Sequence, residues 1–223
     1  MRKIFLVMGG VVLCAFFVVL KFAHANLLIN GDLEVTSGQL LVDPILLSSD
    51  NLIYALFTVH SDALIGWTIG GASIDVIPTS YWTSATGSYS VDLIGTPGLG
   101  SISQTVTGLT SGTAYTLTFA FAANPENYDL EAGSTKILQV SVSNSDLSPT
   151  TFSATAGSAT DLNMNWISES VNFTASATSV TLTMEALMST GLPGTFTVAN
   201  TYCGPAIDSL DLEPSAGNPQ TPE

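Results

Sequence analysis

Basic residues are nearly absent from this 223-residue sequence. Three of its four Lys and Arg residues, Arg2, Lys3 and Lys21, lie within the first 25 positions, which leaves Lys136 alone against 18 Asp and Glu. One basic residue against 18 acidic ones gives a formal net charge of −17 from residue 26 onward, with histidine neutral. Proteins bind nucleic acids and anionic membranes through Lys and Arg that neutralise phosphate charge. We therefore expect no nucleic acid among the partners.

Cysteine and histidine are equally scarce. Beyond residue 25 the chain has one cysteine, Cys203, and one histidine, His60. No internal disulfide can form, so stability must come from a packed core, for which the length is ample. A catalytic triad would have to use His60, and no G-x-S-x-G motif accompanies it. We predict a buried, unreactive Cys203 and no enzyme activity.

The first 25 residues have the three parts of a secretory signal. A basic start precedes an apolar run from Ile4 to Leu20, and Ala23-His24-Ala25 supplies the small residues of a cleavage site. Two alternatives are an uncleaved anchor, because about 17 apolar residues approach a bilayer's thickness, and lipidation of Cys14, which Leu13 disfavours. We expect cleavage before Asn26, a secreted or cell-surface location, and no stable membrane span afterwards.

Short strand patterns fill the chain from Trp67 onward. Tyr115, Leu117, Phe119 and Phe121 alternate with Thr and Ala, the period of a half-buried strand. The other candidates share β-branched and aromatic content between turn residues: Trp67–Ile69, Ser73–Ile77, Tyr89–Ile94, Ser101–Val106, Ile137–Ser143, Trp166–Phe173, Val180–Ala186 and Ile207–Leu212. About ten such strands predict an all-β fold, an antiparallel β-sandwich of the jelly-roll type.

The domain organisation follows from the flanks of this pattern. Between Gly38 and Ile65 the chain is less regular: Leu52, Ile53, Leu56 and Val59 fit one short helical stripe, and a strand is almost as compatible with them. Residues 214–223 are rich in Pro and polar residues, which predicts a disordered tail or linker stub. We predict a signal peptide over 1–25 and one sandwich domain over 26–213.

One acidic residue stands out in the last predicted strand. Asp208 shares strand parity with Leu210 and Leu212, so it should point inward while Asp211 points to solvent. An unpaired buried charge costs several kcal/mol, and the mature chain has almost no cation to pair with it. The sequence favours a bound metal ion as partner, with Asn30-Gly31-Asp32-Leu33-Glu34 as second contributor; Ca²⁺ is the ion that such oxygen ligands suit. The alternative is a carboxylate hydrogen-bonded to backbone amides.

The chain also resembles a known family. Asn26-Leu27-Leu28-Ile29-Asn30-Gly31-Asp32-Leu33-Glu34 is similar to the opening N-L-(L/V)-x-N-G-x-F-E of choice-of-anchor C domain proteins. Further matches follow in the same order: Gly66-Trp67-Thr68, Tyr81-Trp82, Gly87 with Ser90-Val91-Asp92-Leu93, Ser101-Ile102-Ser103-Gln104, Asn124-Pro125, Asn163-Met164-Asn165-Trp166 and Gly204-Pro205-Ala206-Ile207-Asp208-Ser209-Leu210. Together they cover most of the mature chain.

The resemblance carries its own expectations. The family is similar to plant cell-wall proteins of a domain class without assigned function, and more loosely to galactose-binding-like jelly rolls that include carbohydrate-binding modules. It implies a jelly roll on an extracellular surface, with a structural Ca²⁺ held by Glu34 and Asp208. Leu33 departs from the usual Phe, and the segment from Gly38 to Ile65 is longer than usual.

Three functions remain open at this stage. The first is a non-catalytic binding module for extracellular polysaccharide or cell-wall glycan, contacted through Tyr81, Trp82, Asn124, Glu126 and Tyr128. The competing interpretation of the aromatic residues is that Trp67, Trp82 and Trp166 fill the core. The second function is a structural or adhesive matrix protein with extracellular protein partners. The third is a glycosidase, whose carboxylate spacing a sequence cannot give.

Overall fold

A computed structural model describes residues 25–35, 45–46, 55–58, 64–95, 98–126, 135–190 and 203–215. These residues form thirteen β-strands and no helix, and accordingly no helix among them could cross a membrane. The strands are β1 (Ile45–Leu46), β2 (Ala55–Thr58), β3 (Thr68–Gly71), β4 (Ser73–Pro78), β5 (Tyr89–Asp92), β6 (Ile94–Gly95), β7 (Gly98–Thr107), β8 (Ala114–Ala123), β9 (Thr135–Val142), β10 (Thr150–Thr155), β11 (Ile167–Thr174), β12 (Ser179–Thr190) and β13 (Pro205–Pro214).

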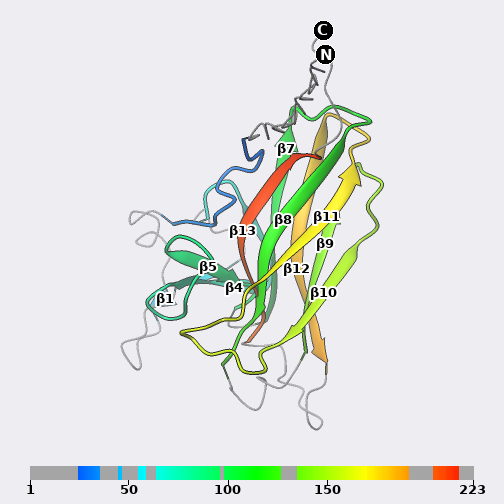
Figure 1. Ribbon diagram of the computed structural model, residues 1–223. Coiled ribbons are helices and arrows are strands. Elements are labelled where there is room, and N and C mark those ends of the chain that lie inside the picture. The colour runs from blue at the N-terminus through cyan, green and yellow to red at the C-terminus, as the bar shows by residue number, and fades with distance from the viewer. Residues whose placement is uncertain are drawn as a thin grey trace, which may run out of the picture.

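The described strands form two antiparallel sheets. The seven-stranded sheet has the order β1-β2-β4-β5-β13-β8-β11, and the six-stranded sheet has the order β10-β9-β12-β7-β3 with β6 paired to β7. In Figure 1 the red strand β13 lies beside the green strand β8, although they are far apart in the sequence. This arrangement confirms the predicted all-β jelly-roll sandwich.

The core lies between the two sheets. Along β8 the side chains of Leu117, Phe119 and Phe121 are almost completely buried, while the residues between them face outward. Phe119 meets Phe152 of β10 edge to face, with 5.2 Å between ring centroids, so this contact joins the two sheets. Burying each such side chain contributes about 2–3 kcal/mol, and the alternation that predicted β8 is therefore the one that builds the core.

Residues 25–35 contact both sheets. The Leu27 amide donates to the Leu212 carbonyl at 2.9 Å, and the Leu210 amide donates to the Gly31 carbonyl at 2.7 Å, so the segment lies against β13 of the seven-stranded sheet. Gln104 of β7 exchanges two hydrogen bonds with the Ile29 backbone, at 2.7 and 2.8 Å. The opening segment therefore reaches the six-stranded sheet as well and is set beside the end of the chain.

Several parts of the strand assignment differ from the sequence prediction: β1 was not predicted, and the predicted strand Tyr89–Ile94 is broken at Leu93 into β5 and β6. Strand β10 was not predicted, because Phe152 and Ala154 are its only apolar residues and the strand lies at the sheet edge. Residues Ala55–Thr58 form strand β2, so the helical alternative for that stretch is wrong there. Most of the remaining 36–63 segment lies outside the described residues, as do His60, residues 1–24 of the predicted signal peptide (1–25) and residues 216–223 of the predicted tail (214–223).

The parity argument for Asp208 is also wrong, although its conclusion about burial holds. The register shifts between Asp208 and Asp211, where Ser209 adopts φ 53°. Because of this bulge, Ile207 and Leu210 both face the core, whereas Asp208 stands opposite Ala120 on the outer face of the sheet. Asp208 is nevertheless fully buried, because the turn that joins β4 to β5 covers it.

Candidate ligand-binding and metal-binding sites

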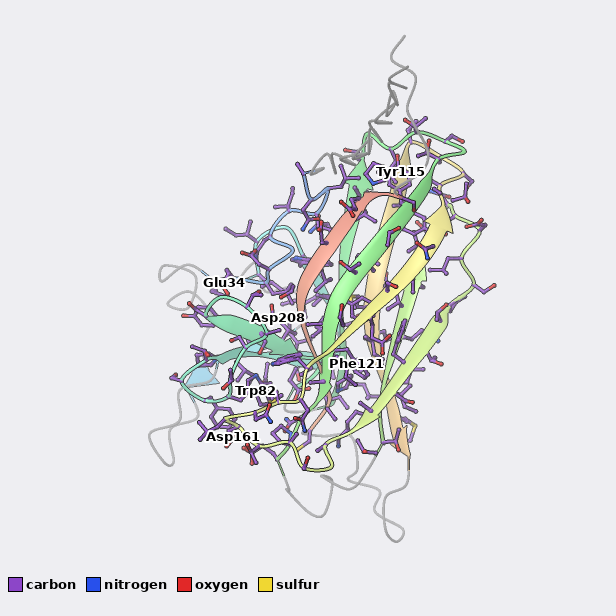
Figure 2. All side chains as sticks on the ribbon, in the orientation of Figure 1. Glu34, Trp82, Tyr115, Phe121, Asp161 and Asp208 are labelled. Carbon is purple, nitrogen blue, oxygen red and sulfur yellow. The ribbon has the colours of Figure 1, made fainter. Side chains whose placement is uncertain are left out.

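The two predicted metal ligands, Glu34 and Asp208, both accept hydrogen bonds from the turn between β4 and β5. Asp208 Oδ2 accepts the backbone amides of Ala85 and Thr86 at 2.8 and 3.0 Å. Glu34 Oε1 accepts those of Ser88 and Tyr89 at 2.7 and 3.1 Å. Figure 2 shows the two acids near each other beside this turn. The structure therefore brings together the two ends of the chain that the sequence singled out.

The charges of Glu34 and Asp208 affect whether a cation would bind between them. Burial raises the pKa of Asp208 to about 6, three backbone amides lower it, and the like charge of Glu34 raises it again. A cation between the carboxylates would remove this repulsion. However, the described residues contain no cluster of three or more His, Cys, Asp or Glu that could hold a metal. Any Ca²⁺ here would need backbone carbonyls, hydroxyls or water to complete its shell.

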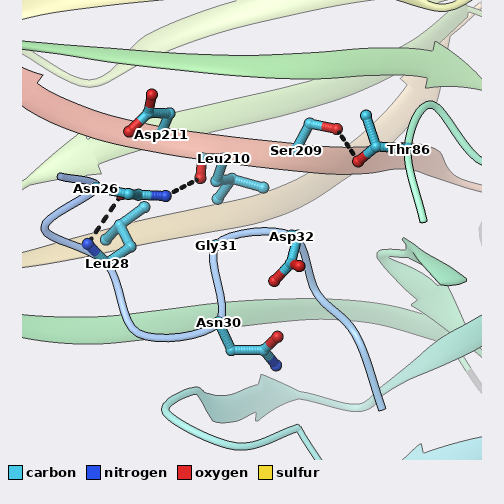
Figure 3. Close-up of a pocket in the computed structure, with 9 residues that line it drawn as sticks. All are labelled: Asn26, Leu28, Asn30, Gly31, Asp32, Thr86, Ser209, Leu210 and Asp211. Atoms are coloured by element: carbon cyan, nitrogen blue, oxygen red, sulfur yellow. Dashed lines mark hydrogen bonds between the residues drawn. The ribbon is translucent and has the colours of Figure 1, made fainter. Parts of the chain in front are cut away.

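An open pocket of about 440 Å³ lies next to this pair, between the opening segment and the bulge of β13. Figure 3 shows the hydroxyls of Thr86 and Ser209, 2.7 Å apart, at one end of it. The carboxylates of Asp32 and Asp211 also line it. Its exposed lining is about equally polar and apolar, so it offers hydrogen-bonding groups but no extended apolar face.

A second polar surface lies at the end of the sandwich where β8 ends. The Tyr81 hydroxyl donates to Glu126 Oε1 at 2.8 Å. Partial burial raises the pKa of Glu126, and the neighbouring Asp161 carboxyl, close enough to hydrogen-bond, raises it further against the lowering effect of Tyr81. Trp166 is partly exposed, and its indole donates to the Thr83 carbonyl at 2.9 Å. Two partly exposed aromatic residues thus accompany two carboxyl groups.

Two other residues predicted from the sequence to bind ligand, Trp82 and Asn124, are buried beneath this surface. Trp82 is 1% exposed, packs in a second apolar cluster with Met164, and donates to Ser90 Oγ at 2.7 Å, so its ring offers no face to a ligand. Asn124 is also buried, and its side-chain oxygen accepts the Glu126 amide at 2.8 Å. Figure 2 shows Trp82 and Asp161 at this same end. Tyr128 lies outside the described residues.

Sequence reasoning missed Asp161 and the buried acids Asp75 and Asp92. Asp161 lies in the connection between β10 and β11, and its backbone carbonyl accepts the Thr83 amide at 2.7 Å, a contact that no local pattern encodes. Asp75 and Asp92 carried a usable signal, because each interrupts a strand that is otherwise buried. Cys203 is buried, as predicted.

Comparison with known sequences identifies one family. A family model described as "Protein of unknown function (DUF642)" matches residues 26–213. The chain is also 31% identical over 193 residues to halomucin of Haloquadratum walsbyi. That alignment covers 86% of this chain but only 2% of halomucin, so the chain spans a very small part of that relative.

Solved structures resemble the fold at low sequence identity. TmCBM61, determined in complex with β-1,4-galactotriose, is 16% identical, with 68% of this chain and 90% of that one aligned at a TM-score of 0.43. A family 35 carbohydrate-binding module from Clostridium thermocellum is 16% identical, with 73% and 98% aligned at a TM-score of 0.42. This likeness concerns the fold alone, and ligand binding must be argued from the residues of this chain.

Proposed function

The chain belongs to the DUF642 family of proteins of unknown function, and from this premise we propose that it is a non-catalytic module that binds an extracellular glycan. The observation that carries the proposal is the surface formed by Tyr81, Glu126, Asp161 and Trp166. Sugars present apolar C–H faces and a rim of hydroxyl groups, so they are bound by aromatic rings beside planar hydrogen-bonding groups. This surface offers both.

The surface is preorganised by its contacts with the rest of the fold. Tyr81 packs against the buried Trp82, with 6.0 Å between the ring centroids at an angle of 57°. The Tyr81 hydroxyl is positioned by Glu126, whose backbone amide is in turn fixed by Asn124. A ligand that meets groups already held in place loses less conformational entropy on binding.

The charge of the protein narrows the class of glycan. Lys136 is the only Lys or Arg beyond residue 25, and its side chain is 0% exposed. No Lys or Arg of the mature chain is therefore available at the surface to pair with a uronate or sulfate group. Carboxylates can still accept hydrogen bonds from sugar hydroxyls or ammonium groups. We infer that the ligand is a neutral or amino-sugar polysaccharide.

In this proposal Ca²⁺ has a structural role. Glu34 and Asp208 would hold the ion beside the turn that begins at Ser84, and the ion would supply positive charge between two acids that repel each other. That turn leads directly from Tyr81 and Trp82 into β5. A bound ion would therefore stabilise the connection that carries the ligand surface. Export through the signal peptide and the resemblance to choice-of-anchor C proteins belong to the same proposal.

Two alternatives make different predictions. A glycosidase needs two carboxyl groups about 5 Å or more apart across the scissile bond, whereas Glu126 and Asp161 approach closely enough to hydrogen-bond. This pair therefore does not have the spacing that glycoside hydrolysis needs. An adhesive matrix protein would bind other proteins and show no glycan affinity.

The test is a screen of the calcium-loaded protein against neutral, amino-sugar and acidic polysaccharides by affinity electrophoresis. We expect retardation by at least one neutral or amino-sugar polymer, and no release of reducing ends from it. If the wild type released reducing ends and Glu126→Gln did not, the protein would be a hydrolase instead. Absence of retardation on every polymer would contradict the proposal and favour the matrix-protein alternative.

A further inference from the structure

Two carboxyl groups, those of Glu126 and Asp161, meet on the candidate ligand surface. The Thr83 amide donates to the Asp161 carbonyl at 2.7 Å, and the Thr83 hydroxyl donates to the Leu162 carbonyl at 3.2 Å. These contacts fix the connection between β10 and β11 beside Thr83. Tyr81, two residues earlier, donates its hydroxyl to Glu126 Oε1 at 2.8 Å. The fold therefore brings the two acids to the same place, where their carboxyl groups come within hydrogen-bonding range.

No basic side chain among the described residues faces this pair of acids. Lys136 is the only Lys or Arg beyond residue 25, and it is 0% exposed. It shares strand parity with the core residues Leu138 and Val140, so its side chain points between the sheets. Two carboxylates this close repel each other unless a proton or a cation lies between them. A cation bound here would therefore come from solution.

Aromatic rings lie beside the acids on the same surface. Tyr81 and Trp166 are both partly exposed. The Tyr81 hydroxyl holds Glu126, and the Trp166 indole donates at 2.9 Å to the carbonyl of Thr83, the residue that fixes Asp161. Aromatic faces attract both the C–H face of a sugar and a positive charge. A ligand that combines a sugar ring with a positive charge matches both features of this surface.

An ammonium group fits this pair better than a metal ion does. Ca²⁺ takes about six to eight oxygen ligands, and the described part of the chain has no cluster of three or more His, Cys, Asp or Glu. A primary ammonium group has three N–H donors and needs no closed shell of ligands. Two neighbouring carboxylates supply enough acceptors for it.

We propose that this surface binds amino sugars whose amine is free, with the ammonium group held between Glu126 and Asp161 and the sugar ring against Tyr81 or Trp166. This inference rests on the proposed function, because it takes the surface to be a glycan site. It narrows the ligand from neutral or amino-sugar polymers to those with an unacetylated amine. An N-acetyl group carries no positive charge and would leave the two acids without a cation.

Binding of such a sugar should release a proton. In the free protein partial burial raises the pKa of Glu126, the Tyr81 hydroxyl lowers it, and Asp161 raises it again. The net shift is upward, so the pair keeps a proton above the ordinary pKa of a glutamate. A bound ammonium group favours the ionised form of both acids. The pKa of Glu126 therefore falls on binding, and the proton leaves.

The affinity should depend on pH for the same reason. For a sugar with a free amine it should rise with pH as Glu126 loses its proton, and fall again where the amine becomes neutral. Buried Asp92 also titrates, and it is linked to this surface through Asn124, which accepts the Glu126 backbone amide. The contribution of Asp92 is the same for free and acetylated sugars. The difference between the two sugars therefore isolates Glu126 and Asp161.

The test is calorimetric titration of the calcium-loaded protein with glucosamine and N-acetylglucosamine oligomers of equal length and linkage. It is run at mildly acidic pH, where the amine is charged, in two buffers of different ionisation enthalpy. We expect the glucosamine oligomer to bind at least about tenfold more tightly, and only its binding heat to depend on the buffer. Asp161→Asn should abolish both effects, and Glu126→Gln is the second variant where Asp161→Asn fails to fold.

Asp146→Asn is the matched control, because an acidic protein attracts any polycation. Asp146 is exposed and accepts the amide of Thr174, at the opposite end of β11 from Trp166. Its substitution changes the net charge as much as Asp161→Asn does, and it should leave both effects in place.

The possible results separate the ligand class from the existence of a glycan site. Equal or tighter binding of the acetylated oligomer, or binding confined to an uncharged polymer, would overturn the amino-sugar assignment and leave the proposed function standing. A preference for the free amine that persists in a folded Asp161→Asn would also overturn it, because general attraction would then explain the preference. If neither oligomer binds and no polysaccharide retards the protein in electrophoresis, the proposed function fails as well.

Discussion

Glu34 and Asp208, 174 positions apart in the sequence, hold the two ends of one turn: Asp208 accepts the amides of Ala85 and Thr86, and Glu34 accepts those of Ser88 and Tyr89. The turn therefore depends on both ends of the chain at once. It also connects the candidate ligand surface at Tyr81 to β5. Substitutions of Glu34 or Asp208 should therefore lower the stability of the protein and make the ligand surface less ordered.

Calcium should raise the melting temperature of the mature protein, because an ion bound only to the folded state stabilises it by mass action. Asp208→Ala should abolish the difference between excess calcium and chelator. Asp146→Asn is a matched control, since exposed Asp146 also accepts a backbone amide, that of Thr174 at 2.6 Å, far from Glu34 in the sequence. Equal melting curves with and without calcium would refute the metal site.

Gly87 should not tolerate a side chain. It has φ 59°, and a Cβ there would overlap the Glu34 carboxylate. We expect Gly87→Ala to cost more than the roughly 1 kcal/mol typical of a positive-φ glycine, measured by urea unfolding. Gly108→Ala is the control, because Gly108 has φ 82° with no atom within 4 Å of its Cβ position. Equal losses in the two variants would show that Glu34 does not constrain the turn.

Without calcium the protein should be more stable in mild acid than at alkaline pH. Burial raises the pKa values of Asp92 to about 7 and Asp208 to about 6, and raises that of Asp75. The folded state therefore binds more protons than the unfolded state, and stability falls as pH rises from about 4 to about 7. Each unit of pKa shift corresponds to about 1.4 kcal/mol.

Asp75→Asn tests this pH dependence, since the amide resembles the protonated acid in shape and carries no charge. The variant should be more stable than wild type at pH 8 and show a shallower loss of stability between pH 5 and pH 8. The readout is the urea midpoint at each pH in chelator. A wild-type midpoint that rises from pH 5 to pH 8 would contradict the assignment.

Acidic polysaccharides should bind more weakly than neutral ones of the same backbone. Beyond residue 25 the chain exposes no Lys or Arg, and the net charge of this part repels polyanions. Added salt should narrow the difference, because it screens the repulsion. Affinity electrophoresis on a polyuronate and on its neutral ester would measure the difference in affinity. Tighter binding to the polyuronate than to the ester, measured in chelator, would contradict the prediction.

The sandwich was predictable from sequence because its strongest strands have clear two-residue alternation. Leu117, Phe119 and Phe121 show this directly. The orientation of Asp208 was not predictable, because one bulge at Ser209 shifts parity, and a non-glycine residue gives no warning of φ 53°. The edge strand β10 was missed for lack of apolar residues. The burial of Trp82 depends on a loop that closes over it, which is a tertiary contact.

The candidate site was predictable only in part. The pair Glu34 and Asp208 came from a resemblance together with a parity argument that the bulge overturns. Tyr81 and Glu126 came from the composition of two loops, and the structure joins them by a hydrogen bond. The third member, Asp161, comes from a connection about 35 residues further along the chain. Only the folded chain brings it to the same surface.

The glycan surface is tested most directly by calorimetric titration of the wild type and Tyr81→Ala with the polysaccharide that retards the protein most. Loss of the ring should weaken binding about tenfold, because such an aromatic contact is worth about 1.5 kcal/mol. Ile29→Ala, which removes an exposed apolar side chain from the opening segment, should bind as the wild type does. Unchanged affinity in Tyr81→Ala, with its fold intact, would contradict the assignment of this surface.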